Sequence, residues 1–423
     1  MKTHAAWWQK GFDFKIFNAA DFVDCWEKHV IEVATGKTKN KSQESALQLL
    51  SDQTKNLWKS FTTNRSELDR EYMSTDKFLS AYLASFLIPN IERTRHIFDA
   101  PRNAAFMLSL FEKEELSILD FGSGPLSSSF GFIIALEQSL QKRSEKSHLK
   151  RLRIVAVERS EKAVQISSRW LKQHVLSSVE LEVSRVTSIP NASDFDVILA
   201  SNVINEIPKK HQLSTVKSLL RCFQKSTPTQ ACQLLILEPA QEEFAKGLSA
   251  LRDEIIESSE LSHIKIEGPC LHHSACPLSE KMKRRDWCWS KAQFVRPPFL
   301  IELDRRTDID HSELAFSYLL LSNSADRVPP KAKALSVSDQ MLLTGDEGKD
   351  ARYQYFKSNQ HKSSKSSDKT IEKLSQSCTK QKLCTSDGEL LAGLRLANQM
   401  NGSGKRGDLI EHLEQFDGVV HER

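Results

Sequence analysis

Residues 118–125, ILDFGSGP, decide the predicted fold. A short apolar run ends at Asp120, and Gly122 and Gly124 follow it before the apolar, helix-like stretch FGFIIALEQSL. Glycine adopts turn conformations that other residues avoid, and it lets the backbone approach a ligand closely. The pattern therefore predicts a strand, a sharp glycine turn and a helix, with room for a ligand at the turn.

Other short apolar runs follow this one and alternate with helix-like stretches. They are LRIVAVERS (152–160), VELEVSRV (179–186), FDVILASNVINEIP (195–208) and ACQLLILEPA (231–240). Apolar runs of this length are typical of strands buried on both faces of a parallel sheet. The alternation predicts a doubly wound, Rossmann-like α/β fold, and we expect a further strand pair at FLIELDRR (299–306) and LAFSYLLLS (314–322).

Changes in composition and in the spacing of apolar residues divide the chain into four predicted parts. Residues 1–112 show apolar residues at three- and four-residue spacing, interrupted by Pro89, and predict an N-terminal helical domain. Residues 113–322 are the expected Rossmann-like domain, with a cysteine-rich insertion at 266–296. The stretch KSNQHKSSKSSDKT lies within 323–382 and predicts a flexible polar linker. Residues 383–423 regain some pattern and make a small C-terminal segment.

Bulk composition favours a soluble globular protein. Of the 423 residues, 39% are hydrophobic and 27% are charged, and the formal net charge is +4. This charge is too mild to indicate nucleic-acid binding by itself, and no apolar run approaches the roughly 20 residues of a membrane span. The N-terminus shows no pattern of a cleaved targeting peptide. We therefore expect a monomer in a reducing, cytoplasmic compartment, with no membrane partner.

A carboxylate at the end of the second apolar run fits the glycine turn. Glu158 stands where an acidic side chain accepts hydrogen bonds from ribose hydroxyls. A dinucleotide fingerprint needs a third glycine and an acidic residue about 20 residues further on. Here Leu126 follows Pro125 and no pyrophosphate cradle is evident, so the S-adenosylmethionine methyltransferase variant fits better. The late position of Glu158 does not match that fingerprint. The alternative is a turn without a ligand. The predicted cofactor-binding residues are Asp120, Gly122, Gly124, Glu158 and Asn202.

The sequence singles out no catalytic residue. Enzymes that methylate the amine of a flipped base place an Asn/Asp-Pro-Pro-aromatic run after the fourth strand. This chain has SNVINEIP there, where Asn202 and Asn205 are candidates to contact a substrate and Glu206 to act as a base. The proline-aromatic clamp is missing. Asn202 and Glu206 are equally suited to capping or orienting the next helix.

Three of the eight cysteines, Cys270, Cys276 and Cys288, lie in the insertion. In a reducing compartment such a cluster is more often a metal site than a set of disulfides. The spacing is wider than the C-x2-C of a zinc ribbon. Cys276 precedes a proline, as do many iron–sulfur ligands. A fourth ligand must come from elsewhere, and the candidates are Cys384, Cys378, His272 and His273.

Two other interpretations of the insertion remain open. Pro269-Cys270 resembles the nucleophile motif of base C5-methylating enzymes, but that motif is expected after the fourth strand rather than the fifth. Basic residues interleaved with Trp287 and Trp289 are typical of surfaces where cations contact phosphates and rings stack on bases. This pattern favours RNA binding over a solvated surface. The basic residues are Lys281, Lys283, Arg284, Arg285, Lys291 and Arg296.

From about Tyr72 onward, the chain resembles the methyltransferase-like small-ribosomal-subunit assembly family, which contains mitochondrial assembly factors and bacterial relatives. The resemblance rests on AYLASFLIPN, LDFGSGP, ASNVINEIP and LILEPA, and most specifically on GPCLHHSACPL together with RDWCWSKAQFVRP. The chain departs from the family at Leu126, where glycine is usual, and at Ala240-Gln241, where Gly-Thr is usual. Both departures lie near the expected cofactor crevice.

The resemblance implies an assembly factor that binds the small ribosomal subunit through its rRNA and that has S-adenosylmethionine as a possible cofactor. It also implies a four-iron, four-sulfur cluster, rather than zinc, and it favours Cys384 over Cys378 as the fourth ligand. The implied ligands are Cys270, Cys276, Cys288 and Cys384. An active S-adenosylmethionine-dependent rRNA methyltransferase is the alternative function. In a eukaryote the expected compartment is the mitochondrial matrix, and in a bacterium it is the cytoplasm.

Overall fold

The computed structural model describes most of the first 323 residues and parts of the C-terminal segment. The described residues are 6–9, 14–35, 43–62, 72–100, 103–143, 147–191, 194–223, 231–270, 273–276 and 287–323, together with the backbone of 341–343, 378–385, 390–396, 409–410 and 418–421.

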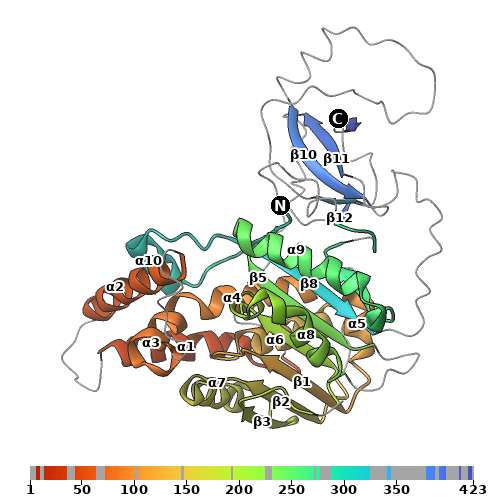
Figure 1. Ribbon diagram of the computed structural model, residues 1–423. Coiled ribbons are helices and arrows are strands. Elements are labelled where there is room, and N and C mark those ends of the chain that lie inside the picture. The colour runs from red at the N-terminus through yellow and green to blue at the C-terminus, as the bar shows by residue number, and fades with distance from the viewer. Residues whose placement is uncertain are drawn as a thin grey trace. The chain divides into compact units, whose positions relative to one another are not determined.

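A mostly parallel sheet forms the centre of the fold (Figure 1). Within the described residues it has eight strands in the order β3-β2-β1-β4-β5-β8-β6, with β7 paired to β8. Strand β1 pairs in parallel with β2 and β4, β2 pairs in parallel with β3, and β6 is antiparallel to β8. The predicted Rossmann-like α/β fold is confirmed. The strands are β1 (Glu115–Phe121), β2 (Arg151–Val157), β3 (Glu180–Val186), β4 (Val197–Ser201), β5 (Gln233–Pro239), β6 (Lys265–Gly268), β7 (Ser290–Gln293) and β8 (Glu313–Ser322).

The chain divides into two compact units. The first comprises Met1–Val203, Ser218–Leu234 and Ala292–Leu314, and it carries β1 to β4 with the glycine turn. The second comprises Ile204–Lys217, Leu235–Lys291 and Ala315–Arg423, and it carries residues 266–291 of the cysteine-rich insertion. The helices are α1 (Ala19–Thr35), α2 (Gln43–Thr62), α3 (Asp76–Ser85), α4 (Leu87–Phe98), α5 (Ala104–Ser109), α6 (Ser127–Arg143), α7 (Glu161–His174), α8 (Lys209–Leu220), α9 (Glu242–Glu257) and α10 (Pro298–Thr307).

Helix α6 is the centre of packing in the first unit. It contacts β1 and β4 on one side and α4 on another. A glycine permits the close approach of α4, because a Cβ atom at Gly131 would lie 2.5 Å from the carbonyl oxygen of Ile91. The buried carboxylate of Glu137, also in α6, accepts hydrogen bonds from the backbone amides of Lys15, Ile16 and Phe17. The residues before β1 are therefore attached to the sheet through α6.

The N-terminal region is helical, as its apolar spacing predicts. Helices α3 and α4 meet at Phe86, and Pro89 lies in the first turn of α4. A proline is tolerated there because the first amides of a helix have no partner within the helix. Helix α2 packs against α3 and also against α10, which belongs to the last sequence segment of the first unit. A separate N-terminal domain and the boundaries at 112 and 322 stay predictions.

One strand prediction is wrong. The stretch FLIELDRR (299–306) is not a strand that pairs with 314–322, because it lies in α10, Pro298–Thr307. The buried residues Phe299, Leu300 and Leu303 follow helical spacing, and a proline begins the helix, where its missing amide costs nothing. The short apolar run resembled a strand because periodicity alone cannot separate a buried strand from a short buried helix.

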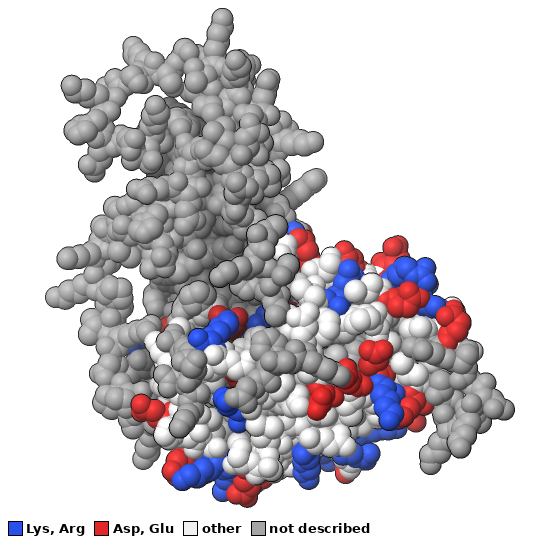
Figure 2. All heavy atoms as spheres, turned by 180° about the vertical axis from the view of Figure 1, so that it is seen from behind, with Lys and Arg blue, Asp and Glu red and all other residues white. Residues whose placement is uncertain are grey.

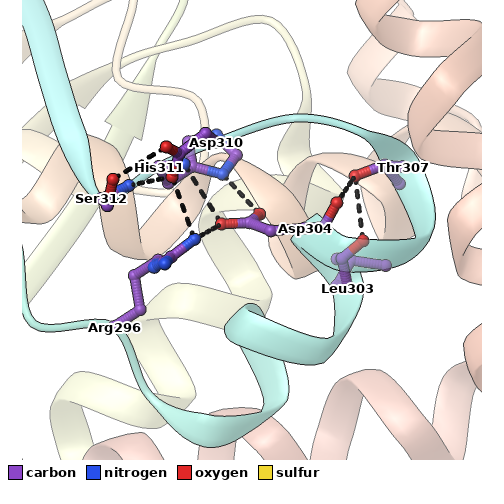
Figure 3. A network of polar contacts seen from close by, with 7 residues as sticks. All are labelled: Arg296, Leu303, Asp304, Thr307, Asp310, His311 and Ser312. Carbon is purple, nitrogen blue, oxygen red and sulfur yellow. Dashed lines mark hydrogen bonds and ion pairs between the residues drawn. The ribbon is translucent and has the colours of Figure 1, made fainter.

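A polar network fixes the end of α10, and Asp304 and His311 within it are buried (Figure 3). The Asp304 carboxylate lies 2.7 Å from Nδ1 of His311, and it accepts a hydrogen bond of 2.8 Å from Arg296. Arg296 also donates a hydrogen bond to the Asp310 carboxylate, which accepts two more from the amide and the hydroxyl of Ser312. Removal of one partner from such a buried pair leaves the other uncompensated. The network therefore holds α10 against the loop that leads into β8.

A second sheet lies within the second unit, and it combines strands of the C-terminal segment with β9 and the start of β10 from the predicted linker. Its described strands are antiparallel in the order β12-β9-β10-β11-β13. Most of the predicted linker at 323–382 lies outside the described residues. The strands are β9 (Met341–Leu343), β10 (Cys378–Thr385), β11 (Leu390–Leu396), β12 (Leu409–Ile410) and β13 (Gly418–His421).

Among the described helices, none has both the length and the apolar character needed to cross a membrane.

Candidate functional site

The predicted crevice lies where the strand order reverses direction. Strands β2 and β4 flank β1 on opposite sides, so the chain after β1 leaves the sheet at a topological switch point. In open α/β sheets, ligands bind outside the carboxyl ends of the strands at such a point. Phe121 at the end of β1 is in register with Val157 of β2 and Ala200 of β4. The predicted site residues that follow these strands therefore lie close together.

The glycine turn has the backbone conformation that the sequence predicts. Gly122 has φ of 64° and Gly124 has φ of 49°, both in the left-handed region. The Gly122 amide donates a 2.9 Å hydrogen bond to the carbonyl oxygen of Val157. A Cβ atom at Gly122 would lie 2.4 Å from Cγ2 of Val203, which follows β4. Both the conformation and the space therefore require glycine at position 122.

Leu126 adopts the conformation that a glycine would adopt. Its φ is 59°, and its side chain is completely buried. A left-handed conformation costs a residue with a Cβ atom roughly 1–2 kcal/mol. Burial of the leucine side chain contributes free energy of similar size and offsets this cost. The departure from glycine at position 126 therefore leaves the turn intact.

Glu158 links the ends of β1 and β2. Its Oε2 atom accepts a 2.8 Å hydrogen bond from the Gly124 amide, and its Oε1 atom accepts one of 2.8 Å from the Ser160 amide. Ser160 then caps α7 by accepting from the Ala163 amide. A carboxylate has about four acceptor positions, so Glu158 keeps capacity for ligand hydroxyls. The predicted ribose acceptor thus lies directly beside the glycine turn.

Asp120 lies beneath the turn and fixes the start of α6. Its Oδ2 atom accepts hydrogen bonds from the amide and the hydroxyl of Ser129, at 3.2 and 2.6 Å. Burial raises the pKa of Asp120 to about 7, against the hydrogen bonds from Ser129, and the nearby Glu158 adds to the rise. Asp120 is 1% exposed, so it acts on the site through the position of α6.

Asn202 follows β4 with φ of 56°, and it is partly buried. Asparagine tolerates this left-handed conformation better than most residues. Asn205 belongs to the second unit, where its backbone amide and side-chain amide both donate to the Glu238 carboxylate at the end of β5. The side-chain oxygen of Asn205 is buried without a hydrogen-bond partner in the described part of the chain. That oxygen remains available to a donor group.

In the second unit, two of the predicted metal ligands lie beside a buried arginine. Nε of Arg252 donates to Sγ of Cys270 at 3.1 Å, and the Cys276 amide donates to the Asp253 carboxylate at 3.0 Å. Burial lowers the pKa of Arg252, but Cys270, Cys276 and Asp253 together raise it above its ordinary value. An adjacent arginine favours the thiolate form that binds metals.

Among the described residues, the predicted ligands Cys270, Cys276 and Cys288 do not form a metal-binding group. No group of three or more His, Cys, Asp or Glu side chains among the described residues is arranged to hold a metal ion. Cys288 is partly buried, and its carbonyl oxygen accepts a hydrogen bond from the Ser317 hydroxyl. Cys384 lies in β10, where only its backbone is described, and His272 lies outside the described residues.

The predicted RNA-binding surface is described only in part. Trp287 donates a 2.7 Å hydrogen bond to the Ala240 carbonyl oxygen, and the Lys291 ammonium lies 5.4 Å from the centre of the Trp289 ring. Arg296 belongs to the ion-pair network of α10. Residues 281–286 lie outside the described residues. Positive and negative side chains are interspersed over the face drawn in Figure 2, so the described residues form no continuous basic surface there.

Polar residues from other elements also lie near the turn, and the sequence pattern did not single them out. Ser160, which holds Glu158, carries an N-cap signal before α7 that could have been found. Tyr82, Asn90 and Arg93 form a hydrogen-bonded group from α3 and α4. Nothing in their local pattern separates them from ordinary helix residues, because their neighbours come from distant parts of the chain.

We expect Gly122→Ala to lower the free energy of unfolding by at least about 2 kcal/mol, through backbone strain and overpacking against Val203. Urea denaturation measures the change. Gly247→Ala is the matched control. Gly247 lies within α9, and a Cβ atom at this position would have no neighbour within 4 Å. The control should gain about 0.5–1 kcal/mol. Equal effects of the two substitutions would show that the turn does not require glycine.

The raised pKa of Asp120 predicts a specific pH dependence of stability. The folded state keeps this carboxyl protonated to about pH 7, whereas the unfolded state loses the proton near pH 4. Its contribution is fully present below pH 4 and is lost as the pH rises toward 7. The unfolding free energy of the wild type should therefore fall relative to that of Asp120→Asn across this window, as measured by denaturation at several pH values.

Asp310→Asn provides a control of opposite sign. Hydrogen bonds from Ser312 hold the pKa of Asp310 below its ordinary value, so its contribution is lost as the pH falls below about 4. If the unfolding free energies of the wild type and Asp120→Asn differ by the same amount at every pH from 4 to 7, Asp120 is ionised in the folded protein over that range.

Comparison with protein families identifies the domain that contains the turn. Residues 112–265 match the family model described as a methyltransferase domain. This range begins just before β1 and ends at the start of β6, so it covers the predicted cofactor residues. No curated protein matches the chain.

Three solved structures illustrate the structural comparison. A candidate class I S-adenosylmethionine-dependent methyltransferase from Listeria monocytogenes is 14% identical, with 74% of this chain and 91% of that chain covered and a TM-score of 0.33. Magnesium protoporphyrin IX methyltransferase from Synechocystis with bound SAM is 11% identical, with 64% and 97% covered and a TM-score of 0.30. Precorrin-6y C5,15-methyltransferase from Geobacter metallireducens is 11% identical, with 52% and 85% covered and a TM-score of 0.26.

The TM-scores lie below 0.5, so the assignment rests on the family match and on the sheet with its glycine turn. The chain contains a methyltransferase-like domain with a Rossmann-like α/β fold.

Proposed function

We propose that the first unit binds S-adenosylmethionine at the glycine turn after β1. The observation that carries this proposal is the contact between Gly124 and Glu158, which places a carboxylate with free acceptor positions beside a left-handed turn at the switch point. The glycine backbone lets a ligand approach, and Glu158 accepts its ribose hydroxyls. The match of residues 112–265 to a methyltransferase domain supports the same cofactor.

The residues of the chain have distinct roles in this site. Glu158 orients the adenosyl group, and Asp120 positions the first turn of α6 through Ser129. Asn202 lines the crevice from the end of β4, where its left-handed backbone brings the chain away from the sheet. When bound, S-adenosylmethionine supplies an electrophilic methyl group.

For the biological role, the proposal is assembly of the small ribosomal subunit through contact with its rRNA. The resemblance of GPCLHHSACPL and RDWCWSKAQFVRP to the assembly family supports this role, as does the cation–aromatic pair of Lys291 and Trp289. The proposed partner is the subunit itself, bound by a monomer in the bacterial-type cytoplasm or, in a eukaryote, the mitochondrial matrix. The missing proline-aromatic clamp after β4 favours assembly over catalysis.

An active rRNA methyltransferase is the second candidate. The observation in its favour is the buried side-chain oxygen of Asn205, which has no hydrogen-bond partner in the described part of the chain. A buried acceptor without a donor costs about 1–3 kcal/mol, and a substrate amine would satisfy it. Glu238 holds the amide side of the same residue and so fixes its orientation.

Calorimetric titration with S-adenosylhomocysteine tests the cofactor proposal. The wild type should bind, and Glu158→Gln should bind at least about tenfold more weakly, because the loss of one charge-assisted hydrogen bond costs about 1.5 kcal/mol or more. Glu161→Gln, an exposed position in the first turn of α7, is the control and should bind like the wild type. Absence of wild-type binding at millimolar ligand would refute the proposal.

Incubation with methyl-labelled cofactor and immature small subunits separates the two candidate roles. The assembly role predicts co-sedimentation of the protein with the subunits and no label in the rRNA. Label in the rRNA that disappears with Asn205→Ala would establish the methyltransferase instead.

We propose further that Cys270, Cys276, Cys288 and Cys384 hold a four-iron, four-sulfur cluster. Arg252 lies beside the first two thiols, and this environment suits thiolate ligands. The Cys276-Pro277 pair and the motif resemblance support iron–sulfur ligation over zinc. Ligation would link the cysteine-rich insertion to the C-terminal segment, and metal binding would supply folding free energy to that segment.

Anaerobic purification followed by iron, sulfide and zinc analysis tests the cluster. The wild type should contain about four irons per chain, and Cys384→Ser should lose most of them, whereas Cys378→Ser on the same strand should retain them. Colourless protein with one zinc per chain would replace the cluster by a zinc site. Loss of iron from Cys378→Ser alone would assign the fourth ligand to Cys378.

A further inference from the structure

An arginine in α4, near the glycine turn, has no acidic partner among the described residues. Arg93 in α4 donates through Nη1 to Oδ1 of Asn90 at 2.6 Å. Asn90 in turn donates through Nδ2 to the Tyr82 hydroxyl at 2.9 Å. The described residues place no carboxylate within 4.0 Å of the Arg93 guanidinium. Arg95, two residues later, is paired with both Glu92 and Asp99.

The lack of a carboxylate matters because Arg93 is half-buried. Burial lowers the pKa of Arg93 to about 10, against an opposing effect from Tyr82. Burial also raises the pKa of Tyr82 to about 12, so the phenol is neutral near pH 7 and cannot serve as a counter-ion. Removing a cation from water without a partner is unfavourable. A guanidinium has five N–H donors, and one hydrogen bond to Asn90 leaves most of them available.

The hydrogen-bonded group of Tyr82, Asn90 and Arg93 is connected to residues of the predicted cofactor crevice. Tyr82 interacts with Ser127, the first residue of α6, and with the charge of Glu158. Thr94, adjacent to Arg93 in α4, lies 3.4 Å from the hydroxyl of Ser128. The first amides of α6 also have no partner within the helix, and they favour an anion. Arg93 therefore belongs to the residues around the turn between β1 and α6.

The crevice needs a cation if its ligand carries a carboxylate. Glu158 already supplies a carboxylate beside the turn, and like charges at short range repel. The amino-acid end of S-adenosylmethionine and of its demethylated product carries a carboxylate. A guanidinium matches that group because two parallel N–H donors can bind its two oxygens.

We propose that Arg93 binds the carboxylate at the amino-acid end of S-adenosylmethionine and S-adenosylhomocysteine. The inference rests on the proposed cofactor function. Glu158 then accepts the ribose end of the ligand and Arg93 holds the opposite end. Asn90 and Tyr82 act as positioning residues, since they hold the guanidinium without neutralising it.

The test compares two ligands that differ in the amino-acid end. S-adenosylhomocysteine has the carboxylate, and methylthioadenosine lacks the whole amino-acid group. Calorimetry should show that Arg93→Gln weakens S-adenosylhomocysteine binding about ten- to hundredfold and leaves methylthioadenosine binding unchanged. The S-adenosylhomocysteine affinity of Arg93→Lys should lie between those of the wild type and Arg93→Gln. An ammonium keeps the positive charge but lacks the two parallel N–H donors of a guanidinium. Lys142→Gln, which removes an exposed ion pair with Asp99, is the control and should change neither affinity.

Unchanged methylthioadenosine affinity also shows that the Arg93→Gln variant is folded. If that variant loses affinity for both ligands, Arg93 stabilises the fold and the inference is wrong. Wild-type affinity of Arg93→Gln for S-adenosylhomocysteine would overturn the inference while leaving the cofactor proposal intact. If the wild type binds neither ligand, the cofactor proposal itself fails, and the inference fails with it.

Discussion

The hydrogen bond from the Gly124 amide to the Glu158 carboxylate connects the two strand ends on which the site depends. The amide belongs to a turn in which Gly122 and Gly124 both adopt left-handed conformations. The turn can close against Val203 only because position 122 has no Cβ atom. Asp120 then fixes the helix that follows, through Ser129. A change in any of these contacts would move the start of α6 and with it the crevice.

The fold was predictable from sequence because buried strands leave a continuous apolar signal. The runs around Leu119, Ile154 and Ile198 correspond to β1, β2 and β4, and Asp120 and Glu158 lie where those runs predict. The stretch 299–306 was not predictable in this way, since a ten-residue helix with three buried apolar residues resembles a strand in composition. Only its flanking prolines indicated a helix.

The candidate site was predictable only where one segment of the chain determines it. The glycine turn and Glu158 carry local signals, whereas the conformation of Leu126 follows from the closure of the turn around it. The packing of α4 on α6, which depends on the small size of Gly131, brings the helix that carries Arg93 close to α6. A single sequence contains no local sign of such a contact. For the same reason, Arg252 beside Cys270 was not foreseen.

Hydrogen–deuterium exchange in the presence and absence of S-adenosylhomocysteine tests the central claim most directly. The account predicts slower exchange on ligand binding in peptides that cover the turn at 120–128 and the strand end at 157–161. It predicts a weaker effect around Asn90 and Arg93 in α4, where the ligand contact is through side chains. Protection confined to other parts of the chain, with unchanged exchange at the turn, would contradict the account.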